Sequence, residues 1–159
     1  YRYAANSINE VQTQGASIGL NYYLDNKFML AGNYSWNELV KTDEDDPIIP
    51  AFNTPKHKYN LSLTARDLKL KGKSTWGFGV NYKWVQGFVF EGSPQFTGSV
   101  PTYDLLDAQV NANFEKLNTT VKLGGSNLLQ NIHIEAYGGP YVGRMLYASL
   151  LYEFNHKKK

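Results

Sequence analysis

Apolar and polar side chains alternate along most of this sequence. Between Lys58 and Arg66 every second residue is apolar, and the residues between are Lys, Asn, Ser, Thr or Arg. A repeat of two places alternate side chains on opposite faces of a strand, so such a segment predicts one apolar and one polar face. The repeat recurs at residues 16–24, 28–36, 58–66, 75–84, 106–114, 120–124 and 144–154, and residues 1–5 are a candidate for an eighth strand. No segment keeps the 3.6-residue repeat of an amphipathic helix, so we expect an all-β fold.

The connections between these segments alternate in length. Short connections at 25–27, 67–73 and 115–118 alternate with long ones at 40–56, 90–101 and 125–143. This order predicts an antiparallel up-and-down sheet with tight turns at one end and large loops at the other. Outer-membrane barrels have the same asymmetry, with short periplasmic turns and longer extracellular loops.

Composition excludes several classes of function. The 159 residues include no Cys and carry a net charge of only +2, which argues against disulfides, thiolate chemistry and nucleic-acid binding. No apolar run approaches the roughly 20 residues of a membrane helix. His57, His133 and His156 lie in separate segments, and the acidic run at 42–46 lacks the spaced ligands of an EF-hand loop. No catalytic motif such as G-x-S-x-G occurs, so we expect no enzyme, no metal site and no cofactor.

Alternation alone does not separate a soluble barrel from a transmembrane one. Aromatic residues near both ends of the apolar faces, such as Tyr34, Trp36, Trp76 and Trp84, match the aromatic girdles of membrane proteins. The polar faces are rich in Asn, Ser and Thr, as expected of a hydrated lumen. Both features favour a transmembrane β-barrel, and a soluble ligand-binding β-barrel is the alternative.

Strand number and direction favour a segment of a larger barrel. Bacterial single-chain barrels have an even number of strands, from 8 upward, whereas this chain predicts about 7–8. The last strand runs from a long loop toward the short-turn end, so the C-terminus would be periplasmic. The strand that ends at Leu24 also runs toward a short turn. Unless residues 1–5 already belong to an up-going strand, Tyr1 is expected near the extracellular side, where a chain threaded from the periplasm should not start. A small non-transporting outer-membrane barrel, serving as anchor or adhesin, is the second alternative.

Four segments resemble the barrel of TonB-dependent outer-membrane receptors, in particular the Bacteroidetes-type group with a carboxypeptidase-regulatory-like N-terminal domain. They are DDPIIPAFNTPKHKYNLSL (45–63), GFVFEGSPQFTGSVPTYDLLDAQV (87–110), KLGGSNLLQN (122–131) and YGGPYVGRMLYASLLYEF (137–154). The resemblance implies the last part of a 22-stranded barrel, with residues 1–154 in the transmembrane wall and 155–159 as a polar C-terminal tail. It also implies that Tyr152 and Phe154 belong to the barrel-assembly signal, although Ser149 stands where that signal usually has Gly.

The same resemblance implies a function and its partners. The chain would help to take up a nutrient (a metal chelate, a glycan or a peptide) across the bacterial outer membrane, with energy from the inner membrane. Its partners would be outer-membrane lipids, the remainder of the barrel with its plug, and the TonB complex, reached through residues upstream of Tyr1. A surface lipoprotein is a further candidate partner, and no nucleic acid is expected.

Two sets of side chains are candidates for substrate contact. Aromatic residues in or beside the long loops could stack on sugars or hold apolar parts of a ligand, or could pack the loops onto one another. These are Phe88, Phe90, Phe96, Tyr103, Tyr137 and Tyr141. Basic residues on the predicted lumen face could attract an anionic substrate or pair with carboxylates of the plug. These are Lys58, Arg66, Lys83 and Lys122.

Overall fold

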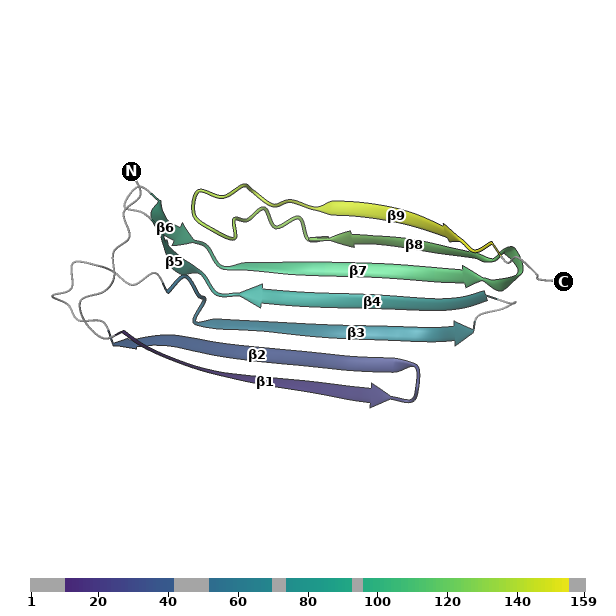
Figure 1. The fold of residues 1–159 in the computed structure, drawn as a ribbon, viewed down its shortest axis with the longest axis horizontal. Helices are drawn as coiled ribbons and strands as arrows, with labels where there is room; N and C mark the ends of the chain where they lie inside the picture. Colours follow the sequence, from purple (N-terminus) through teal and green to yellow (C-terminus); the bar gives the residue numbers. More distant parts are fainter. Residues whose placement is uncertain (1–10, 42–51, 70–73, 93–95, 155–159) are drawn as a thin grey trace.

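Antiparallel strands make up almost all the regular structure in the computed structural model, which describes residues 11–41, 52–69, 74–92 and 96–154. Seven strands form one sheet in the order β1-β2-β3-β4-β7-β8-β9, and β5 and β6 form a separate two-stranded sheet (Figure 1). The strands are β1 (Gln12–Leu24), β2 (Phe28–Lys41), β3 (His57–Lys69), β4 (Ser74–Val85), β5 (Phe88–Glu91), β6 (Thr97–Val100), β7 (Tyr103–Phe114), β8 (Thr119–Ser126) and β9 (Met145–Tyr152).

The large sheet confirms the predicted all-β, up-and-down arrangement. Each of its seven strands corresponds to one segment of alternating residues, and all its pairings are antiparallel. Several strands run further than the alternation predicts, and β2 reaches Lys41 while β3 reaches Lys69. The candidate strand at 1–5 lies outside the described residues.

The connection at 90–101 is not simply a loop, and in this respect the prediction is wrong. Half of its residues, 90–91 and 97–100, belong to a hairpin in which β5 pairs with β6, from Phe88↔Val100 to Glu91↔Thr97. Each strand has only four residues, too few for a periodic signal to stand out in the sequence. The hairpin is stabilised by tertiary packing, because Val100 is completely buried against the end of the large sheet.

The two ends of the large sheet differ in their connections. At the short-turn end, on the right of Figure 1, residues 25–27 join β1 to β2, and a 3-10 turn, η1 (Glu115–Leu117), leads from β7 to β8. At the long-connection end, on the left, lies the β5–β6 hairpin together with the chain that leads from β8 to β9. No α-helix occurs among the described residues.

The described residues contain no helix that is long and apolar enough to cross a membrane.

Pairing register keeps polar residues together on one face of the large sheet, called here the polar face. Ser62 pairs with Asn81, which pairs with Asp107, and these three residues line an open hollow in the sheet. One position further along β3, Leu63 pairs with Val80 on the opposite, apolar face. The polar face and the apolar face are therefore each continuous across neighbouring strands, as the alternation predicts.

The apolar face is left uncovered by the rest of the described chain. Ile18, Leu20 and Leu150 each keep 71% of their surface exposed. Soluble monomers rarely leave a continuous apolar surface of this kind in water. Such a face requires an apolar surrounding, as the lipid-facing wall of a membrane barrel has.

Aromatic side chains gather toward both ends of the apolar face. Near the long-connection end, Tyr59 stacks on Trp84 with ring centroids 5.4 Å apart. Near the short-turn end, the rings of Trp76 and Phe114 meet edge to face at 6.4 Å. Trp76 and Trp84 both lie on β4, about 27 Å apart along the strand, which is the scale of an apolar band about 25 Å tall. The two groups of rings have the arrangement of interfacial girdles.

The facing of β3 can be tested by placing a charge on either side of the sheet. We expect Leu63→Arg to lower the free energy of unfolding by about 2–4 kcal/mol, because it puts a cation at mid-strand against lipid. Ser62→Arg, one residue away, should have little effect, because its side chain enters a hydrated space. Urea unfolding of the full-length protein in lipid bilayers measures both values, and equal losses would contradict the facing.

Candidate functional site

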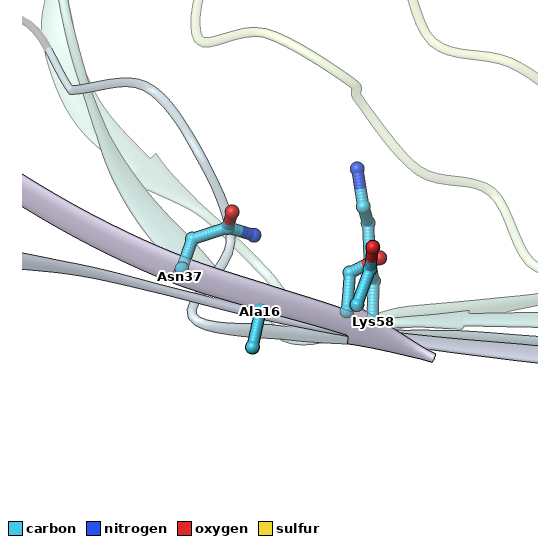
Figure 2. Close-up of a pocket in the computed structure, with 6 residues that line it drawn as sticks. Ala16, Asn37 and Lys58 are labelled. Atoms are coloured by element: carbon cyan, nitrogen blue, oxygen red, sulfur yellow. The ribbon is translucent and has the colours of Figure 1, made fainter. Parts of the chain in front are cut away.

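An open pocket of about 340 Å³ lies on the polar face near the long-connection end of β1, β2 and β3. Ser17, Ser35 and Lys58 occupy one register row across these strands, and Asn37 lies two positions further along β2. Figure 2 shows Asn37 and Lys58 on one side of the sheet and Ala16 on the other. Adjacent strands lie about 4.8 Å apart, so Ser35 is an immediate neighbour of both Ser17 and Lys58. Their hydroxyl, amide and ammonium groups make the pocket rich in hydrogen-bond donors.

The predicted lumen-facing basic residues all lie on the polar face: Lys58, Arg66, Lys83 and Lys122. They fall into two groups along the strands. Lys58 and Lys83 lie toward the long-connection end, where Lys83 Nζ is 5.9 Å from the centre of the Tyr103 ring, a cation–π distance. Arg66 and Lys122 lie toward the short-turn end. None of the four forms an ion pair with another residue that the structure describes.

Half of the predicted aromatic residues pack together where the β5–β6 hairpin meets the large sheet. Tyr103 is 6% exposed and forms a buried cluster with Val85 and Val100. Phe88 and Phe90 pack against this cluster. These three rings therefore hold the hairpin against the end of the sheet, which is the packing role that the sequence left open.

The other predicted aromatic residues lie at the surface of the loops. Tyr141 is 77% exposed, Phe96 is 58% exposed and Tyr137 is 40% exposed. The Tyr137 ring lies against Gly98 of β6, at the place that any Cβ atom would occupy. The Phe96 ring similarly lies beside Gly138. The hairpin and the connection after β8 therefore meet through aromatic rings that still present surface to solvent.

A hydrogen-bonded network that the sequence analysis did not single out anchors the connection after β8. The Asn127 backbone N–H donates to Asp107 Oδ1 at 2.9 Å. Asn127 Nδ2 donates to the Asn131 carbonyl at 2.8 Å, and the Asn131 N–H donates back to Asn127 Oδ1 at 2.9 Å. Asn131 Nδ2 then donates to Asp104 Oδ1 at 2.9 Å. The sequence feature that could have predicted this network is a pair of Asn residues four positions apart after a strand. Asn side chains often hydrogen-bond to backbone groups in turns.

His133 extends this network toward the buried aromatic cluster. It is 5% exposed, and its ring stacks on Tyr103 with centroids 4.3 Å apart. Its Nδ1 lies 2.9 Å from the carbonyl oxygen of Asn131, which makes Nδ1 the protonated nitrogen. Nε2 is buried without a partner among the described residues. His133 thus links the long connection to β7 by stacking.

The remaining predicted residues occupy other parts of the chain. Tyr152 and Phe154 lie at the end of the last strand with their rings edge to face at 4.7 Å. His57 lies beside Tyr34, whose Oη is 2.6 Å from His57 Nδ1. The described ranges hold no group of three or more His, Cys, Asp or Glu residues that could bind a metal ion. The acidic run at 42–46, His156 and the tail at 155–159 lie outside those ranges.

An apolar face with aromatic ends, a polar opposite face and long connections at one end are typical of the wall of an outer-membrane barrel. A family model described as "TonB dependent receptor-like, beta-barrel" matches residues 1–128. The chain belongs to this family and is part of a TonB-dependent outer-membrane receptor; members of the family are transporters rather than enzymes. Comparisons with curated proteins and with solved structures found no significant match. The narrower Bacteroidetes-type group stays a prediction.

The hydrogen bonds around Asn127 should stabilise the connection after β8 against local unfolding. Asn127→Ala would leave the partly buried N–H of Asn131 without a partner and would remove one of the two donors to the Asn131 carbonyl, which costs about 1–3 kcal/mol. We therefore expect chymotrypsin to cleave after Tyr137 or Tyr141 roughly tenfold to a hundredfold faster in the full-length receptor. The matched control is Asn113→Ala on the exposed polar face of β7. Equal cleavage rates in the two variants would show that the network does not hold this connection.

Proposed function

We propose that this chain forms part of the barrel wall of a receptor that takes up a nutrient across the outer membrane, with energy supplied through the TonB complex. A metal chelate, a glycan or a peptide is the proposed nutrient. The observation that carries the proposal is the two-faced sheet. Its apolar face, with rings at both ends, suits lipid, and its polar face of Asn, Ser, Thr and basic residues suits a solute pathway. Membership of the receptor family supports the same conclusion.

The open sheet supports a larger barrel. The edge strands β1 and β9 each pair on one side only, and all their residues are exposed. A strand edge with unpaired N–H and C=O groups is not stable in hydrocarbon. We propose that further strands complete a 22-stranded barrel around a plug, with residues 1–154 in the wall and 155–159 as a polar tail.

Orientation follows from the asymmetry of the connections. The long-connection end would face the outside and the C-terminus the periplasm. Phe96, Tyr137 and Tyr141 would then contact substrate at the surface, while Phe88, Phe90 and Tyr103 would support them from below. A surface lipoprotein covering these loops is a further proposed partner. Tyr152 and Phe154 would direct barrel assembly.

Deletion of the receptor gene in its native host tests the proposed uptake. Growth and radiolabel uptake are measured with iron chelates, oligosaccharides or peptides as the limiting nutrient. We expect the deletion to abolish uptake of one of these classes and complementation to restore it. A TonB-depleted strain should show the same loss, because the energy would come through that complex.

Two controls separate transport from anchoring. A protonophore should stop uptake in the wild-type strain while leaving surface binding of the nutrient intact. A deletion strain that takes up every nutrient normally but no longer adheres to surfaces would contradict the proposal and support an anchor or adhesin.

A further inference from the structure

We propose that Ser17, Ser35, Asn37 and Lys58 form a binding site for a carboxylate, sulfate or phosphate group of the transported solute. The inference names a substrate class, an anionic solute, and in this sense rests on the proposed uptake function. The site itself is defined by the pocket at the long-connection end of the polar face.

The geometry suits a group with several oxygens. Ser17 and Ser35 are directly paired across β1 and β2, and Ser35 is directly paired with Lys58 across β2 and β3. Two hydroxyl donors and an ammonium group therefore stand in one line on the same face, with neighbouring Cβ atoms about 4.5–5.5 Å apart. An oxyanion seated over this row could accept hydrogen bonds from all three side chains, one of them charge-assisted.

Local charge favours an anion over a neutral ligand. Lys58 is exposed and has no ion-pair partner among the described residues, and no carboxylate lines the described part of the pocket. Glu38, the carboxylate of β2, pairs instead with Lys56 at 2.6 Å. Lys83 lies diagonally across β3 and β4, since it pairs with Asn60 two positions from Lys58. Two positive charges, neither of them in an ion pair with a described residue, thus lie near one donor-rich pocket and favour anions.

The facing of the pocket argues against a lipid phosphate as its occupant. Lys58 and Asn37 project from the side of the sheet opposite Ala16 (Figure 2). Ala16 pairs with Trp36, which belongs to the apolar face with Tyr34. Lipid headgroups would lie outside that apolar face, whereas the pocket opens on the polar one. The anion is therefore assigned to a solute in the barrel.

Anion binding to the purified full-length receptor in detergent tests the site directly. Calorimetric titrations use inorganic phosphate, sulfate and citrate, with glucose as the neutral comparison. We expect at least one of the anions to bind and glucose not to bind. Comparison of citrate with phosphate and sulfate distinguishes a carboxylate ligand from a tetrahedral oxyanion. Absence of any anion binding in the wild-type receptor overturns the inference.

Substitutions test whether the anion binds at Ser17, Ser35 and Lys58. Lys58→Met removes the charge but keeps the aliphatic stem, so affinity should fall about tenfold or more, while Lys58→Arg should retain it. The double change Ser17→Ala with Ser35→Ala should weaken binding while leaving the net charge unchanged. Lys116→Met is the matched control, because Lys116 is also an exposed lysine but lies in η1 at the short-turn end of the sheet. Equal binding by Lys58→Met and the wild type overturns the inference.

An alternative occupant gives a different result. If carboxylates of the run at 42–46 neutralise Lys58, the wild type binds no anion, and replacing Asp43, Glu44, Asp45 and Asp46 by amides creates binding. That outcome overturns the site as a solute site.

The experiments distinguish failure of the proposed uptake from failure of the binding site. Anion binding without TonB-dependent uptake contradicts the proposed function alone. Uptake without Lys58-dependent anion binding contradicts this inference alone.

Discussion

Inside a hydrocarbon layer a backbone N–H or C=O group finds no water, so a strand that crosses the layer must bond to strands on both sides. The antiparallel ladder from β1 to β9 meets this requirement for its five inner strands, and among the described residues its register shifts only between Gln12 and Thr13 and between Ala65 and Leu68. Because the register is otherwise continuous, alternate residues of all seven strands fall into two sheet faces. The apolar face, its aromatic ends and the pocket around Lys58 are all consequences of that register.

Beyond the long-connection end of the sheet, side-chain hydrogen bonds and aromatic packing stabilise the connections in place of the backbone bonds between strands. Asn53 bonds reciprocally to the backbone of Glu91, with Asn53 Nδ2 donating at 2.9 Å and the Glu91 N–H donating to Asn53 Oδ1 at 2.7 Å. Asn127 and Asn131 do the same for the connection after β8. Asn53 thereby ties the chain before β3 to β5, and bonds to Asp107 and Asp104 tie the connection after β8 to β7, so exposed rings such as Tyr141 are presented from loops attached to the sheet. The proposed substrate contacts and the proposed oxyanion pocket lie at this same end.

The sequence predicted the strands and their facing well, because a repeat of two is a local property that needs no knowledge of partners. Lys58 and Lys83 could be assigned to the polar face from their neighbours in the sequence alone. The β5–β6 hairpin was missed because four-residue strands carry no clear period. The stacking of His133 on Tyr103 was missed because it joins residues thirty positions apart. No local pattern indicated that Tyr103 would be buried while Tyr141 stays exposed.

By itself the sequence determined that the chain forms long strands with one apolar and one polar face, because the alternation and the positions of Trp and Tyr near strand ends can be read from each segment alone. The tertiary structure alone decided which strands are neighbours, and hence that Ser17, Ser35 and Lys58 share one row. It also decided that half of the loop aromatics support the loops while the others reach solvent. The reason is physical: facing depends on the direction of each side chain from its own backbone, whereas a site depends on register between strands that are distant in sequence.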